Sequence, residues 1–131
     1  MILKSFELNK IKPNNHNFYL FYGNNEGLKE ENIKNLFEKS YIDKIYRYDE
    51  KEILDNIDGF FTTILTKSFF DNEKLIIINR ATDKIKELVE ELIEKNPEDI
   101  KIILNSKNLE KKSTLRKFFE KEKSVICVPF Y

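Results

Sequence analysis

The chain has 131 residues, with 23 basic and 23 acidic side chains and a formal net charge of zero. This length suits one domain with one hydrophobic core, and the balanced charge disfavours a non-specific nucleic-acid binder, which usually has a basic excess. A single histidine, His16, and a single cysteine, Cys127, exclude an internal disulfide and a metal site built from several His or Cys ligands. No apolar run is long enough to span a membrane and no signal-peptide core is present, so we expect a cytoplasmic protein.

Lysine dominates the basic residues, with 20 Lys against 3 Arg. Asn and Ile are also abundant, and all three residue types have A/T-rich codons, which indicates a nucleotide bias in the source genome. We therefore expect the lysines to be mostly solvated side chains on helix surfaces.

The first element in chain order is a continuous aromatic run at residues 18–22 that ends at Gly23. Such a run predicts a strand covered on both faces. Residues 26–39 follow with a moderate helical spacing of apolar residues. Residues 42–48 then alternate imperfectly, which predicts a more exposed strand.

The second half of the α/β pattern begins with a strongly helical stretch from Asp49 to Leu65. Asp49 is the expected N-cap and Glu52 stands at the capping-box position. Gly59 lies inside the stretch and is a candidate position for a kink or a close packing contact. The run at residues 75–78 then predicts a buried central strand.

Two further helix–strand units complete the pattern. Asp83 is the expected cap of a helix that stops at Asn96 and Pro97. A strand is predicted at residues 100–104, and a helix at residues 111–121 leads to a last strand at residues 124–128.

Alternating strands and helices predict an α/β fold, a five-stranded mainly parallel sheet with helices on both faces and right-handed crossovers. The most apolar runs, residues 18–22, 75–78 and 102–104, should be central, and residues 42–48 should form an edge. The chain stops at Tyr131 directly after an apolar strand. We therefore expect residues 1–131 to be one domain, the first of a longer protein.

The turn after the first strand resembles a phosphate-binding loop that has lost its chemistry. Such a loop needs Gly-x4-Gly-Lys-Ser/Thr, in which backbone amides and Lys hold phosphate and the hydroxyl binds magnesium. Gly23 and Lys29 are in register, but Leu28 stands at the second glycine and Glu30 at the hydroxyl. The sequence therefore favours a strand-to-helix turn that binds no nucleotide and no metal.

The other loops also lack catalytic groups. A nucleotide hydrolase would place a carboxylate after the central strand, whereas Asn79 and Arg80 stand there and Asp83 is better explained as a cap. Asn105 and Ser106 could sense a phosphate but suit any turn.

The single histidine and cysteine have structural interpretations. His16 is expected at the surface without a partner. Cys127 is expected as an inert thiol in a buried strand.

Two adjacent aromatic residues stand out in the polar segment Ser68-Phe69-Phe70. One interpretation is that both rings pack under the edge of the sheet. The other is that they form an exposed aromatic pair that anchors the domain in a pocket of a partner.

Residues 18–25, the Ser68-Phe69-Phe70 segment and residues 75–78 together resemble the N-terminal domain of the bacterial DNA polymerase III delta-subunit family. The resemblance spans essentially the whole chain and implies an AAA+-like, P-loop-type domain with a degenerate nucleotide site, no cofactor, and further helical domains beyond Tyr131. It implies that this domain has no catalytic activity itself, although the holoenzyme it would belong to is a DNA-directed DNA polymerase.

The same resemblance implies a role in DNA replication. Ser68, Phe69 and Phe70 would bind a pocket on the sliding clamp, the beta subunit, and help to open the ring or hold it open. Other clamp-loader subunits would be partners and would perform the ATPase work, DNA would be engaged indirectly, and no membrane would be involved. Two alternatives stay open: an active P-loop nucleotide-binding or hydrolysing domain, and a generic nucleic-acid or protein-interaction module of the same fold.

Overall fold

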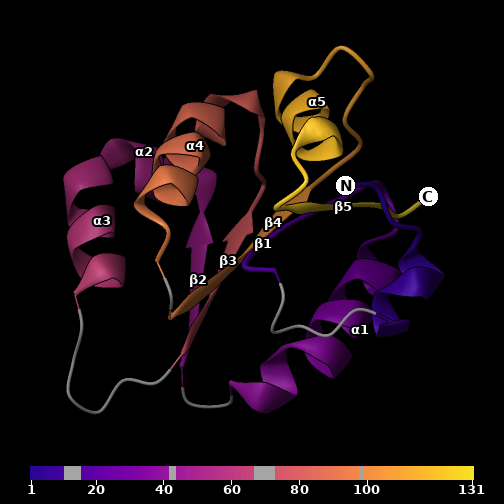
Figure 1. Ribbon diagram of the computed structural model, residues 1–131, viewed down its shortest axis with the longest axis horizontal. Coiled ribbons are helices and arrows are strands. Elements are labelled where there is room, and N and C mark those ends of the chain that lie inside the picture. Colours follow the sequence, from indigo (N-terminus) through magenta and orange to yellow (C-terminus); the bar gives the residue numbers. More distant parts are fainter. Residues whose placement is uncertain (11–15, 42–43, 67–72, 98) are drawn as a thin grey trace.

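The computed structural model describes residues 1–10, 16–41, 44–66, 73–97 and 99–131. Five strands of this part of the chain form one sheet (Figure 1). They are β1 (Phe18–Tyr22), β2 (Ile45–Asp49), β3 (Lys74–Asn79), β4 (Ile100–Ser106) and β5 (Ile126–Pro129). The order is β2-β3-β4-β1-β5 and all four pairings are parallel. The expected parallel sheet, its three central strands and the edge position of β2 are confirmed.

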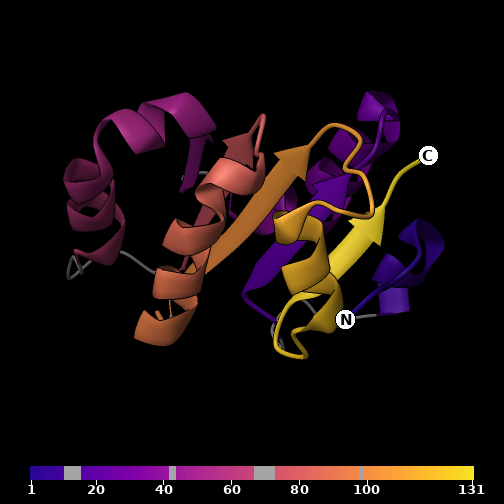
Figure 2. The ribbon, with the colours of Figure 1, turned by 90° about the horizontal axis from the view of Figure 1, so that it is seen from above.

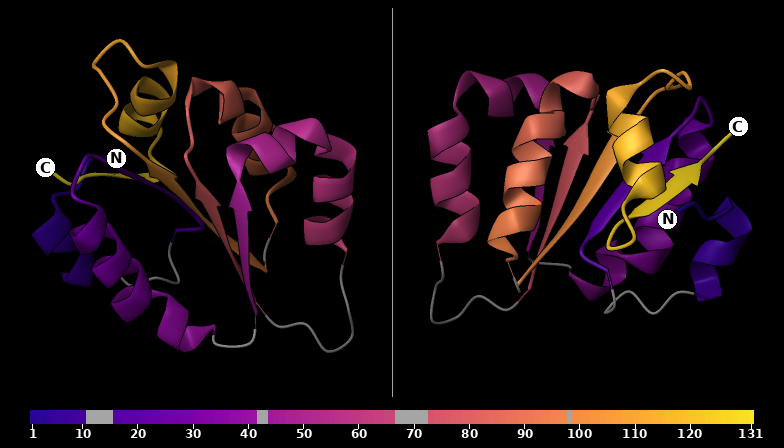
Figure 3. Two further views of the ribbon diagram at one scale, coloured as in Figure 1. Left: turned by 180° about the vertical axis from the view of Figure 1, so that it is seen from behind. Right: turned by 45° about the horizontal axis from the view of Figure 1, so that its top comes forward.

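Helices cover both faces of the sheet. The α-helices are α1 (Glu26–Leu36), α2 (Glu50–Asp55), α3 (Ile57–Leu65), α4 (Lys86–Lys95) and α5 (Thr114–Lys121). Short 3-10 turns occur at η1 (Ser5–Lys10), η3 (Glu38–Ser40) and η4 (Asp83–Ile85). Helices α3, α4 and α5 stand side by side on one face and α1 lies on the other (Figures 2 and 3). Among the helices of the described residues, none is long and apolar enough to cross a membrane.

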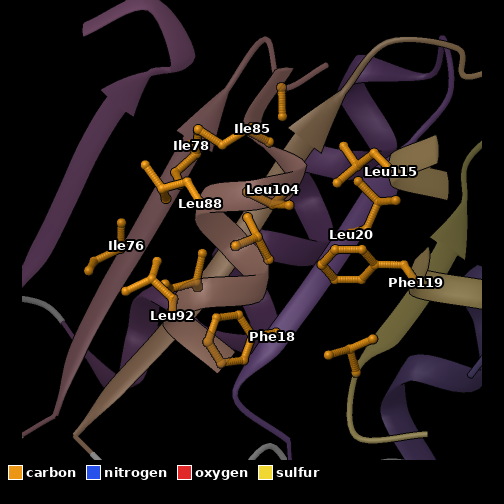
Figure 4. Close-up of a cluster of buried hydrophobic side chains, with 14 of the residues drawn as sticks. Phe18, Leu20, Ile76, Ile78, Ile85, Leu88, Leu92, Leu104, Leu115 and Phe119 are labelled. Carbon is orange, nitrogen blue, oxygen red and sulfur yellow. The ribbon is translucent and has the colours of Figure 1, made fainter. Parts of the chain in front are cut away.

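The two faces explain why the central strands are continuously apolar. Successive side chains of a strand point to opposite faces, so Phe18 and Leu20 join the core under α4 and α5, as Figure 4 shows. Tyr19 and Phe21 point the other way and pack with Ile33 of α1. Each face therefore buries its own hydrophobic cluster, and the sheet needs no polar side along β1.

The expected single helix from Asp49 to Leu65 is wrong, because the chain breaks it at Asn56 into α2 and α3. The Asn56 side chain accepts a hydrogen bond from the Gly59 amide at 3.1 Å and so begins a new helix. A Cβ on Gly59 would lie only 2.3 Å from the Asn56 amide nitrogen, so the glycine makes room for this cap. The expected capping box of Asp49 and Glu52 is confirmed.

Asp83 was expected to cap the helix that follows it in the sequence, and this expectation is wrong, because its carboxylate caps α5 instead. The hydroxyl of Thr82 caps the local turn, accepting from the Lys84 amide at 3.3 Å. The Asp83 carboxylate instead accepts from the Ser113 hydroxyl at 2.5 Å and from the Leu115 amide at 3.1 Å, both at the start of α5. Burial alone would raise the pKa of Asp83, but these hydrogen bonds outweigh it and lower that pKa.

Three lysines are exceptions to the expectation that the lysines are mostly solvated: Lys29, Lys74 and Lys101 are buried. Lys74 donates to the Thr66 carbonyl at 3.1 Å, and Lys101 donates to the His16 carbonyl at 2.8 Å. The long stems pack in the interior while each ammonium reaches a backbone acceptor. Burial lowers the pKa of Lys101.

The remaining differences are small. The helix expected over residues 26–39 ends at Leu36, and the one expected from residue 111 begins at Thr114. The expected strand at residues 42–48 is β2, and residues 42–43 lie outside the described residues. His16 is half-buried rather than fully at the surface. Cys127 is buried as expected, and burial raises the pKa of its thiol to about 12.

Candidate functional site

The carboxyl ends of β1, β3 and β4 meet at one edge of the sheet, where α/β domains bind ligands. β1 leads there into Gly23, which has a φ of +127°. A Cβ at this position would lie 1.9 Å from the carbonyl oxygen of Phe130. The Phe130 amide in turn donates to the Tyr22 carbonyl at 2.7 Å. Gly23 is therefore required by the close approach of the residues that follow β5, whether or not a phosphate binds.

Lys29 is the residue in register with the P-loop lysine, and it is fully buried. Its ammonium donates to Glu26 Oε1 at 2.7 Å and to the Ser106 carbonyl at 2.7 Å. The N-terminus of α1 is capped by the Asn25 side chain, which accepts from the Leu28 amide at 3.1 Å. A helix N-terminus favours an anion, and here the chain supplies one itself, the Glu26 carboxylate. The lysine charge is thus neutralised from within the protein.

A cavity of about 360 Å³ lies at this edge. It is lined by Glu26, Glu30, Asn79, Arg80, Asn105, Ser106 and Lys107. Its two carboxylates repel a phosphate, and the guanidinium of Arg80 is paired with Asp49. Asn105 Nδ2 donates to Asn79 Oδ1 at 3.1 Å, so these two amides bind each other. The cavity has the position of a nucleotide site but not its chemistry.

Of the residues that the sequence analysis singles out, Gly23 directly follows β1, and Leu28, Lys29 and Glu30 lie in the first two turns of α1. The Leu28 side chain is partly buried against the hydrophobic cluster between α1 and the sheet. Sequence reasoning missed Glu26 as the partner of Lys29, although the spacing of three residues within one helix was a usable signal. Among the described residues, no group of three or more His, Cys, Asp or Glu is placed to hold a metal ion.

The expected partner-binding residues Ser68, Phe69 and Phe70 lie outside the described residues. The residues that flank them, Thr66 and Glu73, lie near the amino end of β3, away from the cavity. Tyr41 donates its hydroxyl to Glu73 Oε2 at 2.7 Å, and the Lys74 ammonium binds the Thr66 carbonyl. Burial, with the hydrogen bond to Glu73, raises the pKa of Tyr41. The spacing of these residues in the sequence did not predict the Tyr41–Glu73 or the Lys74–Thr66 hydrogen bond.

Comparison with known proteins identified a matching family model and a solved structure with a similar fold. The family model described as "DNA polymerase III, delta subunit" matches residues 19–128. A search of curated proteins found no match. Among solved structures, the Bacillus subtilis DNA clamp loader delta protein is similar, with a TM-score of 0.65 and 16% sequence identity. The alignment covers 88% of this chain and 39% of that one, so this chain spans about two fifths of that relative's length.

Proposed function

Since this chain belongs to the DNA polymerase III delta-subunit family, we propose that it is a non-catalytic clamp-loader domain that binds the sliding clamp. The observation that carries the proposal is the family match over residues 19–128, which includes the Ser68-Phe69-Phe70 segment. In this proposal Phe69 and Phe70 enter a pocket of the clamp. Other loader subunits are partners and hydrolyse ATP.

The state of Lys29 supports a role without nucleotide chemistry. Its ammonium already has two acceptors, Glu26 and the Ser106 carbonyl, and is buried beneath the turn. A phosphate would have to displace both while facing the carboxylates of Glu26 and Glu30. The free energy for opening the ring must therefore come from binding rather than from hydrolysis in this domain.

The hydrogen bonds at either side of residues 67–72 support the choice of anchor. Lys74 holds the Thr66 carbonyl on one side and Tyr41 holds Glu73 on the other. Fixing both ends of a binding segment lowers the conformational entropy lost when it binds. Each aromatic side chain that the clamp buries would contribute roughly 1.5–3 kcal/mol.

Such binding opens the ring only if the anchor prefers the open state. A ligand shifts a two-state equilibrium by its differential affinity for the two states and by nothing else. We infer that the aromatic pair supplies affinity, while neighbouring surface of the domain favours the opened interface of the clamp.

The test is a titration of the sliding clamp with the full chain and with the double variant F69A/F70A. The variant should lose at least about 100-fold in affinity, since two buried aromatic anchors are removed. F6A is the matched control, because Phe6 is an exposed phenylalanine, 69% accessible, in η1. Equal clamp affinity of F69A/F70A and F6A, with both variants folded by thermal melting, would refute the anchor assignment.

A further inference from the structure

The start of β3 is fixed against both neighbouring strands. The Lys74 amide donates to the Asp99 carbonyl at 2.7 Å, and the Leu75 amide donates to the Lys44 carbonyl at 3.0 Å. Successive side chains of a strand point to opposite faces, and Leu75 belongs to the hydrophobic cluster on the α1 side. The Lys74 side chain therefore lies on the face that α3, α4 and α5 cover, and the Glu73 side chain lies on the α1 side.

Tyr41 presents its hydroxyl to Glu73 from a fixed position. Its side chain is 8% exposed and belongs to the cluster on the α1 side. Its amide donates to the Glu38 carbonyl at 3.1 Å, and its carbonyl accepts from the Lys44 amide at 2.8 Å. The hydroxyl donates to Glu73 Oε2 at 2.7 Å. Because a buried phenol hydroxyl needs an acceptor, this bond holds the Glu73 side chain, which is otherwise exposed.

Lys74 makes the corresponding contact on the other face. It is buried, and its ammonium donates to the Thr66 carbonyl at 3.1 Å. Thr66 is the C-cap of α3, and its amide donates to the Thr62 carbonyl at 3.2 Å. The bond from Lys74 thus connects the end of α3 with the start of β3, which lie at the same edge of the domain (Figure 1). Thr66 and Glu73, on either side of residues 67–72, are held from opposite faces of the sheet.

We propose that Tyr41 and Lys74 are positioning residues for clamp binding. Their role rests on the proposed function, in which Phe69 and Phe70 are the anchor. Neither Tyr41 nor Lys74 touches the clamp in this proposal. Each holds one end of the segment that carries the anchor, so that less conformational entropy is lost when the anchor binds.

The test is a calorimetric titration of the sliding clamp with the full chain and with variants of Tyr41 and Glu73. Y41F keeps the buried ring, removes the hydroxyl and should lower the clamp affinity about 5-fold, the effect of one hydrogen bond. E73L should lower it equally, and Y41F/E73L should bind no more weakly than either, because all three lack the same bond. Since Glu73 is exposed, E73L leaves the core intact.

E73Q separates the hydrogen bond from the charge of Glu73. Its amide oxygen still accepts from the Tyr41 hydroxyl, so it should keep the wild-type clamp affinity. A residue with a merely structural role would not show this rescue by a neutral acceptor. K74M tests the other face of the sheet and should also weaken clamp binding about 5-fold, because the Thr66 carbonyl loses its donor.

Y46F is the matched control, because Tyr46 is partly buried on β2 and its hydroxyl forms no hydrogen bond within the described part of the chain. It should bind the clamp as the wild type does, and thermal melting checks that every variant is folded.

The outcomes separate this proposal from the proposed function. If F69A/F70A binds the clamp as tightly as the wild type, the anchor assignment fails and the positioning role fails with it. If F69A/F70A loses affinity while Y41F and K74M keep it, only the positioning role is overturned. The role is also overturned if E73Q weakens binding as much as E73L, because the clamp would then recognise the charge of Glu73 itself.

Discussion

Lys29 and Ser106 are 77 positions apart in the sequence, yet the Lys29 ammonium donates to the Ser106 carbonyl at 2.7 Å. This bond ties the first turn of α1 to the carboxyl end of β4. The same ammonium forms an ion pair with Glu26, whose side chain keeps about half of its surface in water. A residue that would face a ligand in a P-loop is here part of the domain's interior.

The first prediction concerns the partners of this lysine. E26A leaves the Lys29 charge buried with one carbonyl acceptor and should destabilise the domain by about 3 kcal/mol, the low end for a broken buried pair because Glu26 is half exposed. K29M removes the charge, leaves the Ser106 carbonyl without its donor, and should cost about 1–3 kcal/mol.

The double variant K29M/E26A separates the two effects. It should be more stable than E26A alone in urea unfolding, because the uncompensated charge is gone. A double variant that is less stable than E26A would show that the pair is not what holds this turn.

The second prediction concerns nucleotides. Millimolar Mg-ATP should leave the thermal unfolding midpoint unchanged, because the ammonium of Lys29 is engaged and Glu26 and Glu30 line the cavity. A ligand present at 100 times its Kd would stabilise the fold by about 2.7 kcal/mol. A rise of several degrees with Mg-ATP, absent with magnesium alone, would favour an active nucleotide site instead.

The third prediction separates the structural role of Gly23 from a phosphate-binding role. G23A should cost about 1–3 kcal/mol in backbone strain and more from the clash with the Phe130 carbonyl. G27A is the control, because a Cβ at Gly27 meets only Asn25 Oδ1, at 4.0 Å. It should stabilise α1 by about 0.5 kcal/mol. Equal stability of the two variants in urea unfolding would contradict this account of the turn.

The fourth prediction concerns Asp83, which caps α5 from a neighbouring element. D83A should cost about 1 kcal/mol, the usual effect of losing an N-terminal cap. Since the folded pKa of Asp83 is lowered, its stabilisation is fully present above the unfolded value of about 3.9 and is lost as pH falls through the folded pKa. The wild type should therefore lose stability more steeply than D83A below about pH 4. D55A is the control, because Asp55 is exposed at the end of α2. If the wild type, D83A and D55A lose stability equally below about pH 4, Asp83 does not cap α5.

The strands could be predicted because a strand that is buried on both faces has a continuous apolar sequence, such as residues 18–22. The break at Asn56 could not be predicted, because the helical spacing of apolar residues continues through it. The hydrogen bond from the Gly59 amide to the Asn56 side chain begins a second helix there. The target of Asp83 and the acceptor of Lys29 at Ser106 are tertiary contacts, which no local spacing encodes. At the site, the sequence predicted a degenerate loop at Gly23, Leu28, Lys29 and Glu30 but did not reveal that Glu26 binds the ammonium of Lys29.

The most direct test of the central claim is calorimetric titration of the sliding clamp with the full chain, without nucleotide and with Mg-ATP. We predict saturable binding in both conditions with the same Kd, because the proposed anchor is Phe69 and Phe70 and the ammonium of Lys29 is already bound by Glu26 and the Ser106 carbonyl. Absence of clamp binding without nucleotide, or binding that requires Mg-ATP, would contradict the account.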